Sequence, residues 1–206
     1  MPASGAAGRS TELRIERREE LVASALALLR REGPNALTMR NVADEAGITA
    51  TALYRHFANK EALLTDVVRT AYALFRRSLM GEVPEAQPEA WLRLAFDRFL
   101  RFALEHPNYY RLLFVEPHGV GIDRYPDDFR AGKSSGFRQL RDLVAESMRA
   151  GVLAGQPSRD AADVALTIYA HMHGLITLYL AGRFPDARVF QRFYLESLDR
   201  LLKGLR

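Results

Sequence analysis

Apolar residues recur at spacings of three and four along most of the chain, the spacing that puts side chains on one face of an α-helix. No stretch alternates between apolar and polar residues for long enough to indicate a strand. The pattern therefore predicts an all-α protein with about nine helices. We expect a small N-terminal group of helices followed by a larger C-terminal one.

Glycine, proline and capping residues set the limits of the first four helices. The first apolar stripe stops at Gly33 and Pro34, which are typical of the end of a helix. Thr38, Thr49 and Asn59 can each cap the start of a following helix. The expected segments are a flexible Gly/Ala/Ser-rich arm over 1–11, a three-helix domain over 12–60 with helices at 12–32, 39–46 and 49–54, and a connecting helix over 61–80.

A polar, proline-interrupted break at 82–88 precedes the remaining helices. We expect residues 81–206 to form one domain, with helices over 89–106, 107–114, 127–150, 160–180 and 186–202. The last two helices, the eighth and ninth, carry apolar residues around much of their circumference. A helix of that kind is buried on two sides, which predicts a homodimer formed through these two helices.

The junction of the second and third helices carries the clearest local signal. Ala43 is small enough to let two helix axes approach closely, and Gly47 tolerates the positive φ of a sharp turn. Ile48 and Leu53 are apolar and can fix the third helix to the second. The spacing indicates a helix-turn-helix, with an ordinary helical hairpin of a bundle as the alternative.

This geometry leaves several residues of the third helix facing outward. Its first residues are short, and longer polar side chains follow them: Thr49, Ala50, Thr51, Tyr54 and Arg55. Short residues let a helix approach base edges in a major groove, while hydroxyl and guanidinium groups reach bases or phosphates. The pattern therefore favours double-stranded DNA as a partner.

Charge and composition permit this interpretation without deciding it. The chain has 29 Lys and Arg against 25 Asp and Glu, a net charge of +4 that scattered solvent-facing residues can equally explain. The chain contains no cysteine, which excludes disulfides, zinc sites with thiolate ligands and cysteine nucleophiles. No segment has the pattern of a signal peptide or a membrane span, so we expect a cytoplasmic protein without a membrane partner.

Two sequence blocks resemble the DNA-binding signature of the TetR family of transcriptional regulators. They are TMRNVADEAGI at 38–48 and LYRHFANKEALL at 53–64, and the resemblance extends over about residues 17–68. It implies a dimeric regulator, with repression the simpler mode because occupancy of a promoter is enough. It also implies a palindromic operator and release from DNA by a small-molecule effector.

The resemblance assigns roles to individual residues. Thr38 and Arg40 would contact backbone phosphates, and Thr49, Ala50, Thr51 and Arg55 would lie near base edges. The remaining assignments are phosphate contacts, made by Tyr54, His56 and Lys60. Two alternatives remain open, a histidine packed beneath Phe57 and a purely structural tyrosine ring. Thr51 stands where many members have a smaller residue, so base preference cannot be deduced.

The C-terminal half carries weaker signals. The HMHGL stretch at 171–175 is similar to the His-Gly element of a TetR subclass named for Trp, His and Gly, although the tryptophan is missing. Aromatic residues favour a pocket for a flat or lipophilic effector, or else simply form core. The candidate ligand residues are Phe99, Phe102, Tyr109, Tyr110, Phe114, Tyr169 and His173.

Two other classes of protein are weighed against this interpretation. A small metal-dependent enzyme would have to use His171 and His173, but residues two apart on a helix point in different directions. No catalytic triad order or glycine-rich phosphate loop is present. We therefore expect no enzyme, cofactor or metal. The second alternative is a helical ligand-binding protein that acts through protein contacts.

Overall fold

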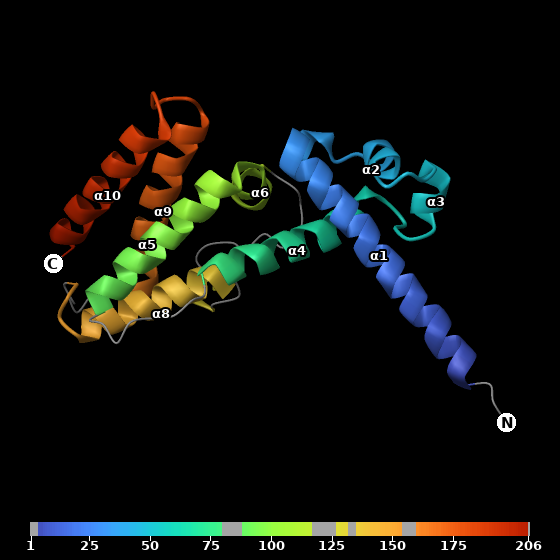
Figure 1. Ribbon diagram of the computed structural model, residues 1–206. Helices are drawn as coiled ribbons and strands as arrows, with labels where there is room; N and C mark the ends of the chain where they lie inside the picture. Colours follow the sequence, from blue (N-terminus) through green and yellow to red (C-terminus); the bar gives the residue numbers. More distant parts are fainter. Residues whose placement is uncertain (1–3, 80–87, 117–126, 132–134, 154–159, 206) are drawn as a thin grey trace. The chain divides into compact units, whose positions relative to one another are not determined.

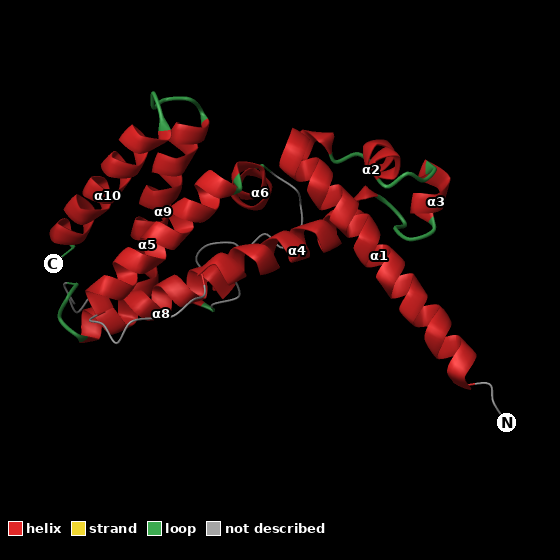
Figure 2. Ribbon diagram, viewed as in Figure 1, coloured by secondary structure: helices red, strands yellow, loops and turns green. Residues whose placement is uncertain are grey.

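The structure is a computed structural model that describes residues 4–79, 88–116, 127–131, 135–153 and 160–205. Within these ranges the chain forms ten α-helices and no strand, as predicted for an all-α protein (Figures 1 and 2). The helices form two compact units. The N-terminal unit consists of residues 1–74 with 106–120, and the C-terminal unit of residues 75–105 with 121–206.

Three capping residues start the helices of the N-terminal unit as predicted. Thr38 Oγ1 accepts a hydrogen bond from Asn41 N at 3.1 Å, and Thr49 Oγ1 accepts one from Ala52 N at 3.2 Å. Asn59 Oδ1 accepts from Ala62 N at 2.8 Å. The elements are α1 (Ser4–Glu32), the 3-10 turn η1 (Pro34–Ala36), α2 (Met39–Glu45), α3 (Ala50–Tyr54) and the first part of α4 (Lys60–Leu79).

Helix α1 is longer than predicted. The expected arm over 1–11 is helical from Ser4 onwards. No proline follows Pro2 in this stretch, and alanine is the best helix former, so the helix can continue through the arm. The core of the unit lies where α1, α2, α3 and α4 meet, and its fully buried side chains include Leu21, Leu29, Leu53, Phe57 and Leu63.

In the C-terminal unit, α8 packs against α5 and α9, and α10 packs against α9 and α5. Asp160 and Asp186 cap the two last helices, accepting hydrogen bonds from Ala162 N at 3.1 Å and Val189 N at 2.8 Å. The elements are α5 (Pro88–Glu105), α7 (Asp127–Arg130), α8 (Ser135–Arg149), α9 (Ala161–Leu180) and α10 (Ala187–Gly204).

One predicted helix is divided into two. The single helix expected over 127–150 is instead the separate helices α7 and α8, and the glycine at 132 lies outside the described residues. Gly136 belongs to α8, where a Cβ would lie 3.2 Å from Phe75 Cε1, so glycine allows a close approach there. The predicted break at 82–88 lies outside the described residues except for Pro88.

The helix expected over 107–114 begins at Pro107 as predicted but changes form within one turn. Helix α6 (Pro107–Tyr110) runs into the π-helical turn η2 (Arg111–Val115), closed by the hydrogen bond from Glu116 N to Arg111 O at 2.9 Å. This segment packs against α1. It therefore belongs to the N-terminal unit, whereas we expected residues 81–206 to form a single domain.

None of the helices in the described part of the chain combines the length and the apolar character that a bilayer span requires.

Candidate nucleic-acid interface

The turn between α2 and α3 has the geometry that its sequence predicts. Gly47 adopts a φ of 66°, in the left-handed region that favours glycine. Ile48 N donates a hydrogen bond to Ala43 O at 3.0 Å, which closes the turn. Ala43 and Leu53 are buried beneath the turn. The two short helices therefore form a tight pair with a fixed outer face.

Most of the DNA-contacting residues predicted in and beside α3 are exposed. Thr49, Thr51, Tyr54 and Arg55 are exposed, and Ala50 is half-buried. Tyr54 is 52% exposed and so lies outside the buried core. Thr49 uses its oxygen to cap α3, which leaves its hydroxyl proton available to an outside acceptor. One short helix thus presents hydroxyl, phenol and guanidinium groups to solvent.

Helix α2 contributes Thr38 and Arg40 to the candidate interface. Thr38 is half-buried because its hydroxyl caps the helix. The Arg40 side chain is 87% exposed, and its guanidinium lies 4.0 Å from the Asp44 carboxylate one turn later. A surface pair of this kind is worth little, so Arg40 can exchange it for a phosphate at small cost.

His56 and Lys60 flank the start of α4. Lys60 is exposed at the first turn of this 20-residue helix, where backbone amides and the helix dipole also attract anions. His56 is half-buried, and its Nδ1 is buried with no hydrogen-bond partner among the residues that the structure describes. The packing alternative for His56 therefore has support in this structure.

Two residues that the sequence analysis missed lie directly behind this segment. Arg18 of α1 donates from Nε to Asp66 Oδ2 and from Nη1 to His56 O, both at 2.6 Å. Its guanidinium carbon lies 4.2 Å from the centre of the Phe57 ring. Asp66 is only 5% exposed and also pairs with Arg69 at 3.0 Å. The signal was present, because Asp66 is a carboxylate within the apolar stripe of α4.

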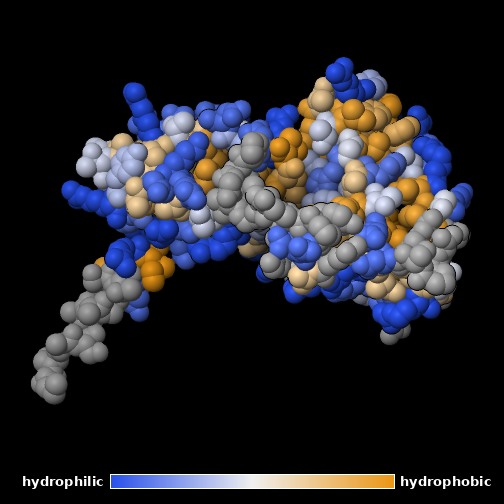
Figure 3. Space-filling view, turned by 180° about the vertical axis from the view of Figure 1, so that it is seen from behind, coloured by the Kyte–Doolittle hydropathy of each residue, from blue (hydrophilic) through white to orange (hydrophobic). Residues whose placement is uncertain are grey.

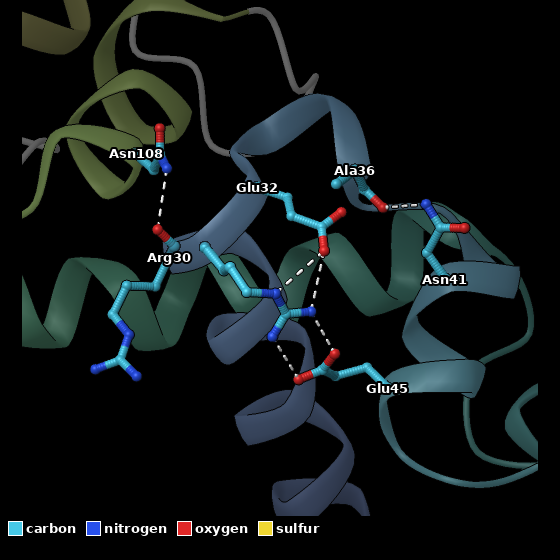
Figure 4. A network of polar contacts seen from close by, with 7 residues as sticks. Arg30, Glu32, Ala36, Asn41, Glu45 and Asn108 are labelled. Atoms are coloured by element: carbon cyan, nitrogen blue, oxygen red, sulfur yellow. Dashed lines mark hydrogen bonds and ion pairs between the residues drawn. The ribbon is translucent and has the colours of Figure 1, made fainter.

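A polar network fixes the far end of α2 to α1 (Figure 4). Arg31 donates to both carboxylate oxygens of Glu45, at 3.1 and 2.6 Å, and also pairs with Glu32. The hydrogen bond from Arg31 lowers the pKa of Glu45 below its ordinary value. Asn41 Nδ2 donates to Ala36 O at 3.0 Å. Side chains at both ends of α2 thus fasten it to neighbouring elements.

Helix α6 is joined to the C-terminal end of α1. Asn108 Nδ2 donates to Arg30 O at 3.1 Å (Figure 4), and the Tyr109 hydroxyl donates to Leu26 O at 3.3 Å. Burial raises the pKa of Tyr109, which keeps its hydroxyl protonated as a donor. Asn108 satisfies a carbonyl in the last turn of α1, which a helix end leaves without a partner in the same helix.

The predicted ligand residues fall into two groups. In the C-terminal unit, the His173 ring lies 4.1 Å from Tyr169 and 5.0 Å from Phe99, centre to centre. Phe102 contacts Phe75, with ring centres 5.0 Å apart. Burial lowers the pKa of His173 to about 3, so the imidazole is neutral at physiological pH. These four predicted residues belong to α5 and α9, and each contacts another aromatic ring of the same unit.

The other three candidates belong to the N-terminal unit. Tyr110 and Phe114 have ring centres 5.2 Å apart, and Phe114 also contacts Tyr72 at 6.1 Å. Tyr109 packs on α1 through the hydrogen bond described above. The structure therefore gives these three rings a place in the packing of α6 and η2, and the prediction of one common ligand site remains untested.

The two histidines of α9 have separate surroundings. His171 Nε2 lies 3.0 Å from Ser197 Oγ of α10, whereas His173 packs among aromatic rings. Burial, with a smaller contribution from Arg200, lowers the pKa of His171. The described residues contain no group of three or more His, Cys, Asp or Glu side chains placed to hold a metal ion.

A short helix pair with an exposed polar face, in a chain that also contains a larger helical unit, is typical of helix-turn-helix regulators. Residues 21–67 match the model of bacterial regulatory proteins of the tetR family, and residues 92–205 match a tetracyclin repressor-like C-terminal domain. Since the second match alone covers more than half of the chain, the protein belongs to the TetR family of regulatory proteins.

Solved structures are similar over nearly the whole chain. A protein of unknown function from Rhodococcus sp. RHA1 is 26% identical with a TM-score of 0.69, covering 91% of this chain and 94% of that one. BioQ with its double-stranded DNA operator is 23% identical with a TM-score of 0.60, covering 91% and 96%. A TetR variant from Acinetobacter baumannii AYE in complex with minocycline is 20% identical with a TM-score of 0.58, covering 91% of each chain.

Proposed function

We propose that this protein is a repressor that binds a palindromic operator as a dimer and leaves it when a small molecule occupies the C-terminal unit. The main observation in favour of this proposal is the exposed face of α3, which Gly47 and the buried Leu53 hold in a fixed orientation. A helix presented in this way fits a major groove. The operator complex of BioQ supports this proposal as a property of a protein with the same fold.

The contacts proposed for DNA divide into two kinds. Thr49, Ala50, Thr51 and Arg55 face base edges, where hydroxyl and guanidinium groups distinguish one base pair from another. The phosphate contacts come from both sides of this helix, and they are Thr38, Arg40, Tyr54, His56 and Lys60. Phosphate contacts supply affinity and register, whereas base contacts supply sequence preference.

The proposed dimer forms through α9 and α10. Leu178 of α9 and Phe193 and Leu195 of α10 are 48%, 40% and 44% exposed, so both helices carry apolar side chains that a second copy can cover. A Cβ on Gly174 would meet nothing within 4 Å, so packing within the chain does not require glycine there. Figure 3 shows more extensive hydrophobic areas on the C-terminal unit than on the N-terminal one in that view. Two subunits would read the two halves of an inverted repeat.

The proposed effector site lies among the aromatic rings of α5, α8 and α9. A neutral imidazole surrounded by Phe99 and Tyr169 suits an uncharged, flat or lipophilic molecule. The minocycline complex of the TetR variant supports ligand binding as a property of the same fold. Catalysis is not part of this proposal, and the cytoplasmic location remains a prediction.

Selection from fragmented genomic DNA tests the function directly. The purified full-length chain is mixed with the fragments at moderate salt, and the retained fragments are sequenced. We expect a small set of sites that share an inverted repeat, with half-sites about 10 base pairs apart or a multiple of that. Retention of no fragment above background would refute DNA binding, and sites without a repeat would refute the dimeric arrangement.

A further inference from the structure

Arg18 occupies a place from which it controls the segment between α3 and α4. Its guanidinium makes three contacts with groups distant in sequence: the Asp66 carboxylate, the His56 carbonyl and the face of Phe57. Because guanidinium is planar with several donors, one such group can hold all three at once. The segment from His56 to Lys60 is thus held against α1 by contacts with Arg18.

Asp66 is the fixed point of this arrangement. Its carboxylate is almost fully buried, and one oxygen faces Arg18 while the other faces Arg69. A buried carboxylate has to be paired, so it holds the Arg18 side chain in a single orientation. The backbone around His56 depends on that orientation, because Arg18 Nη1 donates to the His56 carbonyl at 2.6 Å.

We propose that Arg18 and Asp66 are positioning residues for operator binding, which set the place of the His56–Lys60 segment without contacting bases. This inference rests on the proposed function. Lys60 follows His56 by four residues, and Asn59 caps α4 within the same segment. A shift of the backbone at His56 therefore moves the ammonium group of Lys60 relative to the phosphate that it contacts.

The alternative is that Arg18, whose side chain is 39% exposed, simply adds positive charge near DNA. Two substitutions separate the alternatives. Asp66→Asn removes a negative charge, so electrostatics alone predicts equal or tighter DNA binding. Arg18→Lys conserves the charge, so electrostatics alone predicts no change. A lysine cannot donate to Asp66 and to the His56 carbonyl in the fork geometry of arginine, so a positioning role predicts weaker binding in both variants.

The experiment measures the affinity for the selected operator between low and moderate salt. We expect Asp66→Asn and Arg18→Lys each to weaken binding about tenfold or more. The slope of log affinity against log salt should become shallower by about 0.9 per subunit, as one phosphate contact is lost. This shallower slope is diagnostic, because neither substitution removes a positive charge and a smaller folded fraction leaves the slope unchanged.

Asp44→Asn is the matched control, because it removes the same charge from an exposed position of the same unit. It should bind as tightly as the parent or more tightly. Circular dichroism at the assay temperature establishes that each variant is folded, and Arg18→Lys decides the question if Asp66→Asn is not. Unchanged affinity and slope in the folded variants would overturn the positioning role alone. A parent protein that binds no operator would overturn the proposed function together with this inference.

Discussion

The candidate DNA-binding residues of the N-terminal unit and the candidate effector residues of the C-terminal unit differ in their exposure. In the N-terminal unit, Thr51, Tyr54, Arg55 and Lys60 are exposed, and a separate set of buried side chains supports them. In the C-terminal unit, the candidate residues are themselves packing residues, and Phe99 is only 4% exposed. The proposed DNA binding is therefore separable from the stability of the first unit, whereas the proposed effector binding is combined with the packing of the second.

The largest effect is expected for a candidate effector residue. Phe99→Ala should lower the free energy of unfolding by about 3–5 kcal/mol, because the ring fills the space between Phe75, Tyr169 and His173. Denaturant unfolding followed by circular dichroism measures this loss. Trp91→Ala in the same helix is the control, since Trp91 is 39% exposed and should cost much less. Equal losses in both variants would contradict the distinction between packed and exposed rings.

A smaller effect is expected from the titration of His173. Its pKa is about 3 in the folded chain against 6.5 for an exposed imidazole, so between these values the unfolded chain binds a proton that the folded chain does not. The contribution of His173 to the free energy of unfolding is therefore fully present above pH 6.5 and declines as the pH falls towards 3. Between pH 7 and pH 5 the free energy of unfolding falls by about 2 kcal/mol for this reason.

His173→Phe removes this contribution without removing a ring from the cluster. The difference in unfolding free energy between the parent and the variant, measured in urea at pH 7 and pH 5, should therefore change by that amount. An identical pH dependence in both proteins would show that the imidazole is accessible to protons in the folded state.

The smallest change in stability is expected at the candidate DNA-binding face. Lys60→Ala and Thr51→Ala should each alter the free energy of unfolding by no more than about 0.5 kcal/mol, since both side chains are exposed. Lys60→Ala should weaken binding to every DNA sequence and make the salt dependence shallower, whereas Thr51→Ala should change the preference among sequences. If both substitutions lowered affinity for all duplexes alike, the division into phosphate and base contacts would fail.

Local rules were sufficient to predict the caps and the sharp turn of the short helix pair, whereas the resemblance to the TetR family was needed to choose a helix-turn-helix over an ordinary helical hairpin. The caps at Thr38, Thr49 and Asn59 and the left-handed Gly47 depend only on residues a few positions apart, and each is confirmed. The ion pair of Arg18 with Asp66 joins residues 48 positions apart, and periodicity contains no information on such pairs. The charged residue in an apolar stripe indicated that a partner must exist but not which one.

Prediction was weaker in the C-terminal half for a related reason. Aromatic residues there follow the helical period whether they line a ligand site or fill a core, so periodicity could not place seven rings in one group. The association of α6 with α1 depends on two side-chain hydrogen bonds to carbonyl groups, from Asn108 and Tyr109. Neither residue type at that position predicts a contact with the first helix.

Residues 106–116 pack against the first helix, and this restricts how parts of this chain can be exchanged with those of a related regulator. In a chimera joined after residue 74, the candidate DNA-binding part would come from one protein and α6 from another. The carbonyl groups of Leu26 and Arg30 would then face the side chains of the other protein in place of Tyr109 and Asn108. A graft that preserves the parent's Asn108 and Tyr109 keeps those bonds. The part that can be exchanged as one piece is thus discontinuous in sequence. It consists of the amino-terminal residues together with a short internal segment.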